Sequence, residues 1–204
     1  MNSVFDRFVK KYDAWYDKNK FAYLSELEAL RKILPNKGKG LEIGVGTGRF
    51  AVPLGIKFGV DPSKRMLEFA KARGIKVELG SGEDLSFNRA SFDYVVIIIT
   101  LCFVKDPLKV LKETKRVLRK NGKLIIGIID KDSFLGEFYH TKQNIFYRQA
   151  HLCSVKELAS LLRQVGFEKI SYFQTLFSLP GNITSIEKPQ KGFGKGGFVV
   201  IVAQ

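Results

Sequence analysis

The sequence predicts an α/β fold built on an open, largely parallel sheet, and three observations support this prediction. Short apolar runs at 41–44, 58–61 and 75–79 alternate with longer amphipathic stretches, which is typical of βαβ units. The run at 92–100 is almost entirely apolar, as expected of a central strand covered on both faces. Three glycines alternate with other residues directly after the first strand, where α/β proteins bind ligands.

Gly44, Gly46 and Gly48 form a loop between the first strand and a predicted short helix, which Pro53 and Gly55 interrupt. Glycine adopts positive φ angles and lets another molecule approach the backbone closely. The N-terminus of the following helix would present unpaired N–H groups and a partial positive charge to the loop. The pattern predicts a cradle for a polar ligand, although a tight turn without a ligand satisfies it equally.

Asp61 ends the second predicted strand, which lies beside the first in a βαβ unit. Its carboxylate would therefore adjoin the glycine loop, where it can accept hydrogen bonds from both hydroxyls of a ribose. Asp61 also suits the N-cap of a helix that starts near Pro62, and the two roles are compatible. Together, the loop and the acid favour a cofactor that contains a nucleoside.

The later elements are bounded by terminal signals. A helix at 63–73 ends at Gly74, and Asp106 followed by Pro107 begins a helix that Gly122 ends. The next strand is predicted at 123–129.

Two predicted strands close the chain. Ser154 and Glu157 form a capping box that opens a helix through residue 165. Apolar or alternating strands are predicted at 167–176 and 197–203, separated by a loop of roughly 20 residues, which is long for a compact domain.

Several stretches resemble, in order, the motifs of class I S-adenosylmethionine (SAM)-dependent methyltransferases, in particular the small-molecule "type 11" group. A dinucleotide-binding fingerprint would place its third glycine at position 49, where this chain has Arg49. The resemblance covers about residues 39–130. The stretches that carry it are 41–50, 59–63, 80–87, 91–96 and 106–124.

The resemblance implies a doubly wound, mostly parallel sheet of seven strands in the order 3-2-1-4-5-7-6, with strand 7 antiparallel and helices on both faces. It implies SAM as cofactor and S-adenosylhomocysteine (SAH) as product. Ser81 stands where the family often has an aspartate, so a hydroxyl or backbone contact would replace a carboxylate there. Glu42 would either reach the methionine amino group of the cofactor or accept N–H groups of the loop alone. The implied cofactor-binding residues are Glu42, Gly44, Gly46, Gly48, Asp61, Pro62, Ser81, Gly82, Glu83, Thr100 and Leu101.

The chain is predicted to form a single methyltransferase domain over residues 1–204. A helical lid at 1–34 would precede the SAM-binding core at 39–130, and an insert at 130–153 would precede the C-terminal helix and hairpin at 154–204.

Residues 4–18 read as an amphipathic helix, and residues 21–34 as a second helix that buries Phe21 and its apolar neighbours. Tyr12, Trp15 and Tyr16 lie on the apolar face of the first helix, and each ring carries a polar O–H or N–H group, which suits a partly solvated surface. We expect this helix to close over cofactor and substrate, with ordinary packing against the core as the alternative.

The insert at 130–153 would lie above the pocket as a substrate lid or as a helical cap with an aromatic core. Tyr139, His140 and Arg148 are its candidate substrate contacts. Methyl transfer needs donor and acceptor held in line in a dry pocket rather than a catalytic triad. If the acceptor must lose a proton, the candidate bases are Asp130, Asp132, His140 and His151.

Composition sets the remaining expectations. The chain has 204 residues, a net charge of +14 and two cysteines, without a paired spacing or a histidine cluster, so no metal site is expected. It has no long apolar run and no signal-peptide pattern, which predicts a cytoplasmic protein without a membrane partner. The charge permits a nucleic-acid partner, but the scattered basic residues favour a solvated surface.

These features predict an enzyme that transfers a methyl group to an N, O or S atom of a small-molecule substrate. Methylation of RNA or protein is the first alternative. An NAD-binding oxidoreductase or a non-catalytic nucleotide-binding module is the second. The sequence leaves the oligomeric state open.

Overall fold

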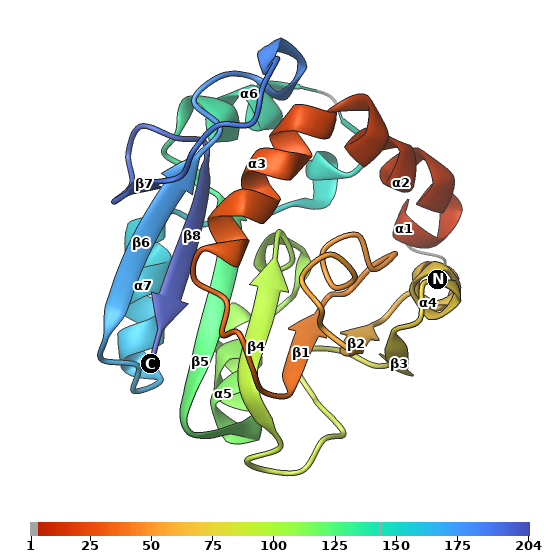
Figure 1. The fold of residues 1–204 in the computed structure, drawn as a ribbon, viewed down its shortest axis with the longest axis vertical. Helices are drawn as coiled ribbons and strands as arrows, with labels where there is room; N and C mark the ends of the chain where they lie inside the picture. The colour runs from red at the N-terminus through yellow and green to blue at the C-terminus, as the bar shows by residue number, and fades with distance from the viewer. Residues whose placement is uncertain (1–3, 143) are drawn as a thin grey trace.

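The structure is a computed structural model that describes residues 4–142 and 144–204 (Figure 1). One sheet runs through it, in the order β3-β2-β1-β4-β5-β8-β6-β7. Strands β1 to β5 are parallel, whereas β8 is antiparallel to both β5 and β6. The strands are β1 (Gly40–Ile43), β2 (Phe58–Asp61), β3 (Lys76–Leu79), β4 (Phe92–Ile98), β5 (Leu118–Ile129), β6 (Ile170–Thr175), β7 (Gln190–Lys191) and β8 (Phe198–Ala203).

This order confirms the predicted sheet, with β6 and β8 as the sixth and seventh strands. The difference is β7, a two-residue strand inside the long loop that precedes β8. It pairs antiparallel with β6 at the edge of the sheet, so the strand count is eight rather than seven.

Helices cover both faces of the sheet, with α3 on one face and α5 and α7 on the other (Figure 1). Side chains alternate along β4, so that Val96 and Ile98 enter one core while Val95 and Ile97 enter the other. This explains the continuous apolar run of the central strand. The helices are α1 (Val4–Arg7), α2 (Val9–Lys18), α3 (Lys20–Arg31), α4 (Lys64–Ala72), α5 (Pro107–Val117), α6 (Phe134–Thr141) and α7 (Val155–Gln164), with short 3₁₀ turns η1 (Leu101–Phe103), η2 (Tyr147–Gln149) and η3 (Pro180–Asn182).

The predicted helix caps are present. The Asp106 carboxylate accepts the backbone N–H of Lys109 at 3.0 Å, and Ser154 forms the predicted capping box with Glu157. Ser63, rather than Asp61, caps α4, because its Oγ accepts the N–H of Met66 at 3.2 Å. The side chain of Asp61 therefore does not serve as the helix cap.

The predicted helix after the glycine loop is wrong, because residues 44–55 form a series of turns. Gly46, Gly48 and Gly55 have positive φ angles, and Pro53 cannot donate a helical hydrogen bond. Without a helix, its N-terminal dipole cannot contribute to the cradle. The backbone amides of the turns remain as donors.

Three further boundaries differ from the prediction. Helix α5 ends at Val117 rather than near Gly122, and β5 begins at once with Leu118. The amphipathic stretch at 4–18 is divided at Phe8 into α1 and α2. On α3, Phe21 is exposed rather than buried, and the buried face carries Glu26 instead. Within the described residues, no helix is long and apolar enough to cross a membrane.

Candidate cofactor and acceptor site

The glycine loop lies at the tip of β1, against the end of β4. Gly44, Gly46 and Gly48 have φ angles of +74°, +50° and +81°, so the loop depends on glycine backbone geometry. A Cβ atom on Gly44 would lie 2.3 Å from the Oγ1 atom of Thr100. The loop can therefore approach β4 only because position 44 has no side chain.

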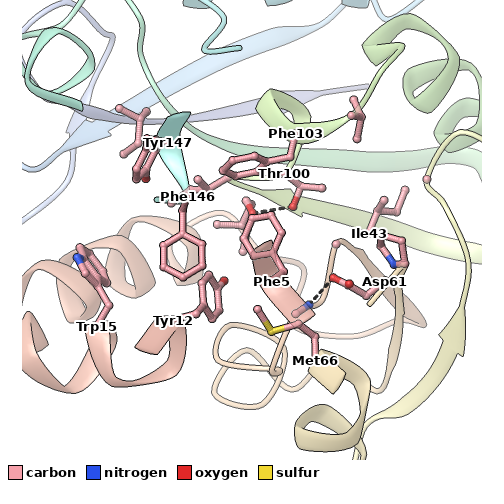
Figure 2. Close-up of a pocket in the computed structure, with 18 of the residues that line it drawn as sticks. Phe5, Tyr12, Trp15, Ile43, Asp61, Met66, Thr100, Phe103, Phe146 and Tyr147 are labelled. Carbon is pink, nitrogen blue, oxygen red and sulfur yellow. Dashed lines mark hydrogen bonds between the residues drawn. The ribbon is translucent and has the colours of Figure 1, made fainter. Parts of the chain in front are cut away.

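Asp61, at the end of β2, is bonded to the same loop. Its Oδ2 accepts the backbone N–H of Gly46 at 2.9 Å, and its Oδ1 accepts that of Ser63 at 2.9 Å. Burial raises the pKa of Asp61 to about 6, although these two hydrogen bonds counteract part of the effect. Each carboxylate oxygen keeps capacity for a further donor, and the side chain lines the cavity described below (Figure 2).

Glu42 lies inside β1 and is 2% exposed. Among the described residues, its Oε2 has no hydrogen-bond partner. Burial raises the pKa of Glu42 well above its usual range, and the nearby charge of Asp61 adds to this, while a hydrogen bond from the Ala51 backbone opposes it. The side chain lies beneath the loop and does not line the cavity.

The loop that follows β3 contributes Ser81 and Gly82 to the cavity wall, but not Glu83. The Glu83 carboxylate accepts the backbone N–H of Asp106 at 2.7 Å and the hydroxyl of Ser81 at 3.1 Å, so it braces the loop. Thr100 lines the cavity, whereas Leu101 is buried behind it. Gly48 also lies outside the lining.

An ionic cluster fastens α2 to the glycine loop. The Asp13 carboxylate accepts hydrogen bonds from Arg49, Arg73 and the hydroxyl of Thr47, all at 2.7–2.9 Å. Burial opposes ionisation of Asp13, but these donors outweigh it and hold its pKa well below its usual range. Arg49 also pairs with the exposed Asp17 at 2.8 Å. The residue that departs from the dinucleotide fingerprint thus attaches the N-terminal helix.

Aromatic rings close the space above the loop (Figure 2). Phe5 of α1 stacks on Phe146 with ring centroids 5.5 Å apart, and Tyr12 contacts Phe146 edge to face at 5.9 Å. Tyr139 of α6 stacks on Tyr147 of η2 at 4.1 Å. The N-terminal helices and the insert at 130–153 therefore meet over the carboxyl ends of the strands.

These groups enclose a cavity of about 220 Å³. Of the cofactor residues predicted from sequence, Gly44, Gly46, Asp61, Pro62, Ser81, Gly82 and Thr100 line it. Of the predicted acceptor contacts, Tyr12, Trp15, Tyr16 and Tyr139 line it.

The other candidate substrate contacts and bases do not line the cavity. Asp132, His140, Arg148 and His151 are exposed and do not line the cavity. Asp130 is buried, but its Oδ1 accepts backbone N–H groups of Val155 and Asp132 and so joins the end of β5 to α7. None of the four candidate bases lines the cavity.

Comparison with known proteins identifies the family. The family described as "Methyltransferase domain" matches residues 41–126. A solved structure from Thermotoga maritima, described as a SAM-dependent methyltransferase and possible histamine N-methyltransferase, is 48% identical, with a TM-score of 0.96. The alignment covers 100% of this chain and 99% of that one. The chain belongs to the SAM-dependent methyltransferases.

Two other proteins are similar to this methyltransferase over nearly their whole length. The uncharacterized protein MJ1123 of Methanocaldococcus jannaschii is 48% identical over 99% of this chain and 98% of its own length. The ubiquinone/menaquinone biosynthesis C-methyltransferase UbiE of Rickettsia felis is 28% identical over 94% of this chain and 92% of its own length. SAM is accordingly the cofactor and SAH the product, which excludes the NAD-dependent alternative.

Sequence reasoning missed several polar residues in the cavity of this methyltransferase, namely Lys11, Glu26, Asn144 and Tyr147. Glu26 on α3 is the most buried of them. Glu26 lies four residues after Ala22 and four before Leu30, both of which are fully buried. A charged residue in the middle of a buried helical face is the signal that could have revealed it.

Proposed function

We propose that this methyltransferase transfers the SAM methyl group to an N, O or S atom of a small molecule held in the aromatic cavity. The single observation that carries the proposal is the position of that cavity. It opens directly on the glycine loop and Asp61 and is covered by rings from α1, α2 and the insert.

The cofactor end of the site is formed by β1, β2, β4 and the loop after β3. The unused acceptor capacity of Asp61 suits the ribose hydroxyls, and the missing side chains of Gly44 and Gly46 suit close approach of the cofactor to the backbone. The Ser81–Gly82 backbone is the proposed boundary of the adenine pocket. These features fit SAM, whose sulfonium supplies an already activated methyl group.

Residues of α2 and the insert form the acceptor end. Tyr12, Trp15, Tyr16 and Tyr139 would surround the acceptor, exclude water and hold the receiving atom in line with the methyl group. The salt bridges of Asp13 would keep α2 in place as a lid. The protein thus contributes positioning rather than a nucleophile of its own.

Methyl transfer from labelled SAM tests the proposal. We expect label to enter compounds in a panel of small amines, phenols and thiols, with histamine included because it is an amine. Label that appears only in RNA or protein would contradict a small-molecule acceptor. Failure of SAH to raise the melting temperature would contradict the cofactor site itself.

A further inference from the structure

Glu26 is a buried carboxyl group that the protein itself leaves unsatisfied. The residue is 1% exposed and lines the cavity from α3. Within residues 4–142 and 144–204, its Oε2 has no hydrogen-bond partner, and no lysine, arginine or histidine forms an ion pair with it.

A carboxyl group in such a place is destabilising unless something binds to it. Burial of a polar group without a partner is unfavourable, and burial of an unpaired charge is more so. Neighbouring Ser25 shows the usual solution, because its hydroxyl donates to the Phe21 carbonyl at 2.7 Å and accepts the Glu187 N–H at 2.8 Å. Glu26 forms no such bond with any residue that the structure describes, so its partner is expected to come from the contents of the cavity.

The rings around Glu26 favour a positively charged partner. Tyr16, Tyr139 and Tyr147 line the same cavity, and Tyr139 and Tyr147 present a stacked pair. Aromatic faces attract cations through the ring quadrupole, and a carboxylate attracts them by charge. Asp61 and Lys11 also line the cavity, but Asp61 is bonded to the glycine loop, and within the described residues Lys11 forms no ion pair with Glu26. The Glu26 carboxyl among aromatic rings therefore favours a cation that also carries apolar surface.

We propose that Glu26 binds a positively charged nitrogen of the methyl acceptor, so that the acceptor is a small organic amine. This inference rests on the proposed function, because it concerns the acceptor in the same cavity. Glu26 is then the residue that selects the acceptor by charge, while Asp61 and the glycine loop serve the cofactor.

The protonation state of Glu26 should change when the amine binds. Burial raises its pKa to about 8, so near pH 7 the empty site holds mainly the neutral acid. A bound ammonium group stabilises the carboxylate, so its binding should release close to one proton from Glu26. The surrounding phenols stay protonated in this range, since burial raises the pKa of each. They are Tyr12 and Tyr16 on α2, Tyr23 on α3, Tyr139 on α6 and Tyr147 in η2.

Titration calorimetry on the full chain saturated with SAH tests the inference without turnover. The probes are histamine and three compounds of similar shape: phenethylamine, phenethyl alcohol and hydrocinnamate, which are cationic, neutral and anionic. We expect at least one amine to bind at least about tenfold more tightly than the alcohol and the acid. The enthalpy of amine binding should differ between phosphate and Tris buffers, because a proton is released.

Two variants distinguish an effect of the Glu26 carboxylate from a general effect of a substitution on α3. Glu26→Gln keeps the shape of the side chain and should abolish both the amine preference and the proton release. Glu28→Gln changes an exposed carboxylate on the same helix and should bind the amines as the wild type does. SAH affinity, which should be unchanged in both, reports that each variant is folded.

The outcomes distinguish this inference from the proposed function. If neither amine binds better than the alcohol, or if Glu26→Gln retains the preference, the role of Glu26 is overturned. Catalysed methylation of a neutral alcohol or thiol in preference to every amine would overturn it while leaving small-molecule methyl transfer intact. Loss of SAH binding by the wild-type protein would instead contradict the proposed function.

Discussion

The carboxylate of Asp13 holds the guanidinium of Arg49 through two hydrogen bonds, from Nε to Oδ1 at 2.9 Å and from Nη2 to Oδ2 at 2.7 Å. Asp13 belongs to α2 and Arg49 to the glycine loop, so this pair joins the roof of the cavity to the cofactor side. The position of α2 and the conformation of the loop are therefore physically coupled.

Replacement of Asp13 tests this coupling. Asp13→Ala leaves the partly buried Arg49 and Arg73 without their shared acceptor, so we expect a loss of about 2 kcal/mol in unfolding free energy. SAH affinity should fall about tenfold because α2 is no longer held against the glycine loop. Thermal denaturation and titration calorimetry measure the two effects. The control is Asp17→Ala, which removes an exposed partner of the same arginine and should behave as the wild type does. Equal effects of the two variants would contradict the coupling.

The pKa of Asp61 predicts how cofactor binding depends on pH. Burial raises this pKa to about 6 in the free protein, and only the carboxylate can accept two ribose hydroxyls. SAH affinity should therefore fall about tenfold between about pH 7 and about pH 5, as the group becomes protonated. Asp61→Asn should bind SAH weakly, with little change over that range. A wild-type affinity that rises on acidification would count against ribose binding by Asp61.

Gly44 and Gly55 allow a controlled test of the glycine loop, with Gly44 as the test position and Gly55 as the control. Both have positive φ angles, at +74° and +70°, but only a Cβ on Gly44 meets another group, the side chain of Thr100. Gly55→Ala should lose about 1 kcal/mol from backbone strain alone. Gly44→Ala should lose more stability and should also lose SAH binding, because loop and β4 must separate. Chemical denaturation with and without SAH measures both. Similar losses in the two variants would show that the contact with Thr100 is unimportant.

The raised pKa of Glu26 predicts how the stability of the ligand-free protein depends on pH. Its pKa is about 8 in the folded protein, above its ordinary value of 4.5. The contribution of Glu26 to stability is therefore greatest below its ordinary value of 4.5 and is lost as pH rises from there through about 8, where the buried group must ionise. Glu26→Gln removes that ionisation, so the variant should melt at higher temperature than the wild type at about pH 9 and should match it near pH 5. A variant that is less stable at every pH would indicate that Glu26 has an internal partner.

Much of the cofactor half of the site could be predicted from the sequence. Alternating glycines and a strand-terminal acid are local patterns, and parallel strands bring their carboxyl ends to one edge. The structure accordingly places Gly44, Gly46 and Asp61 together. The acceptor half was less accessible, because Glu26 and Tyr147 come from segments far apart in the chain and were not among the predicted contacts.

The sequence by itself determined the glycine loop and the family, because short-range patterning and ordered motifs encode them, and the strand order was implied by the resemblance to that family. Only the tertiary structure decided that turns replace a helix after Gly48, that Arg49 reaches Asp13, and that His140 and His151 do not line the cavity. The physical reason is that hydrogen bonding and burial depend on which distant segments meet. Periodicity along α3 can place Glu26 on a buried face. Whether another residue bonds to its carboxyl group there depends on how distant segments pack, which the sequence pattern does not reveal.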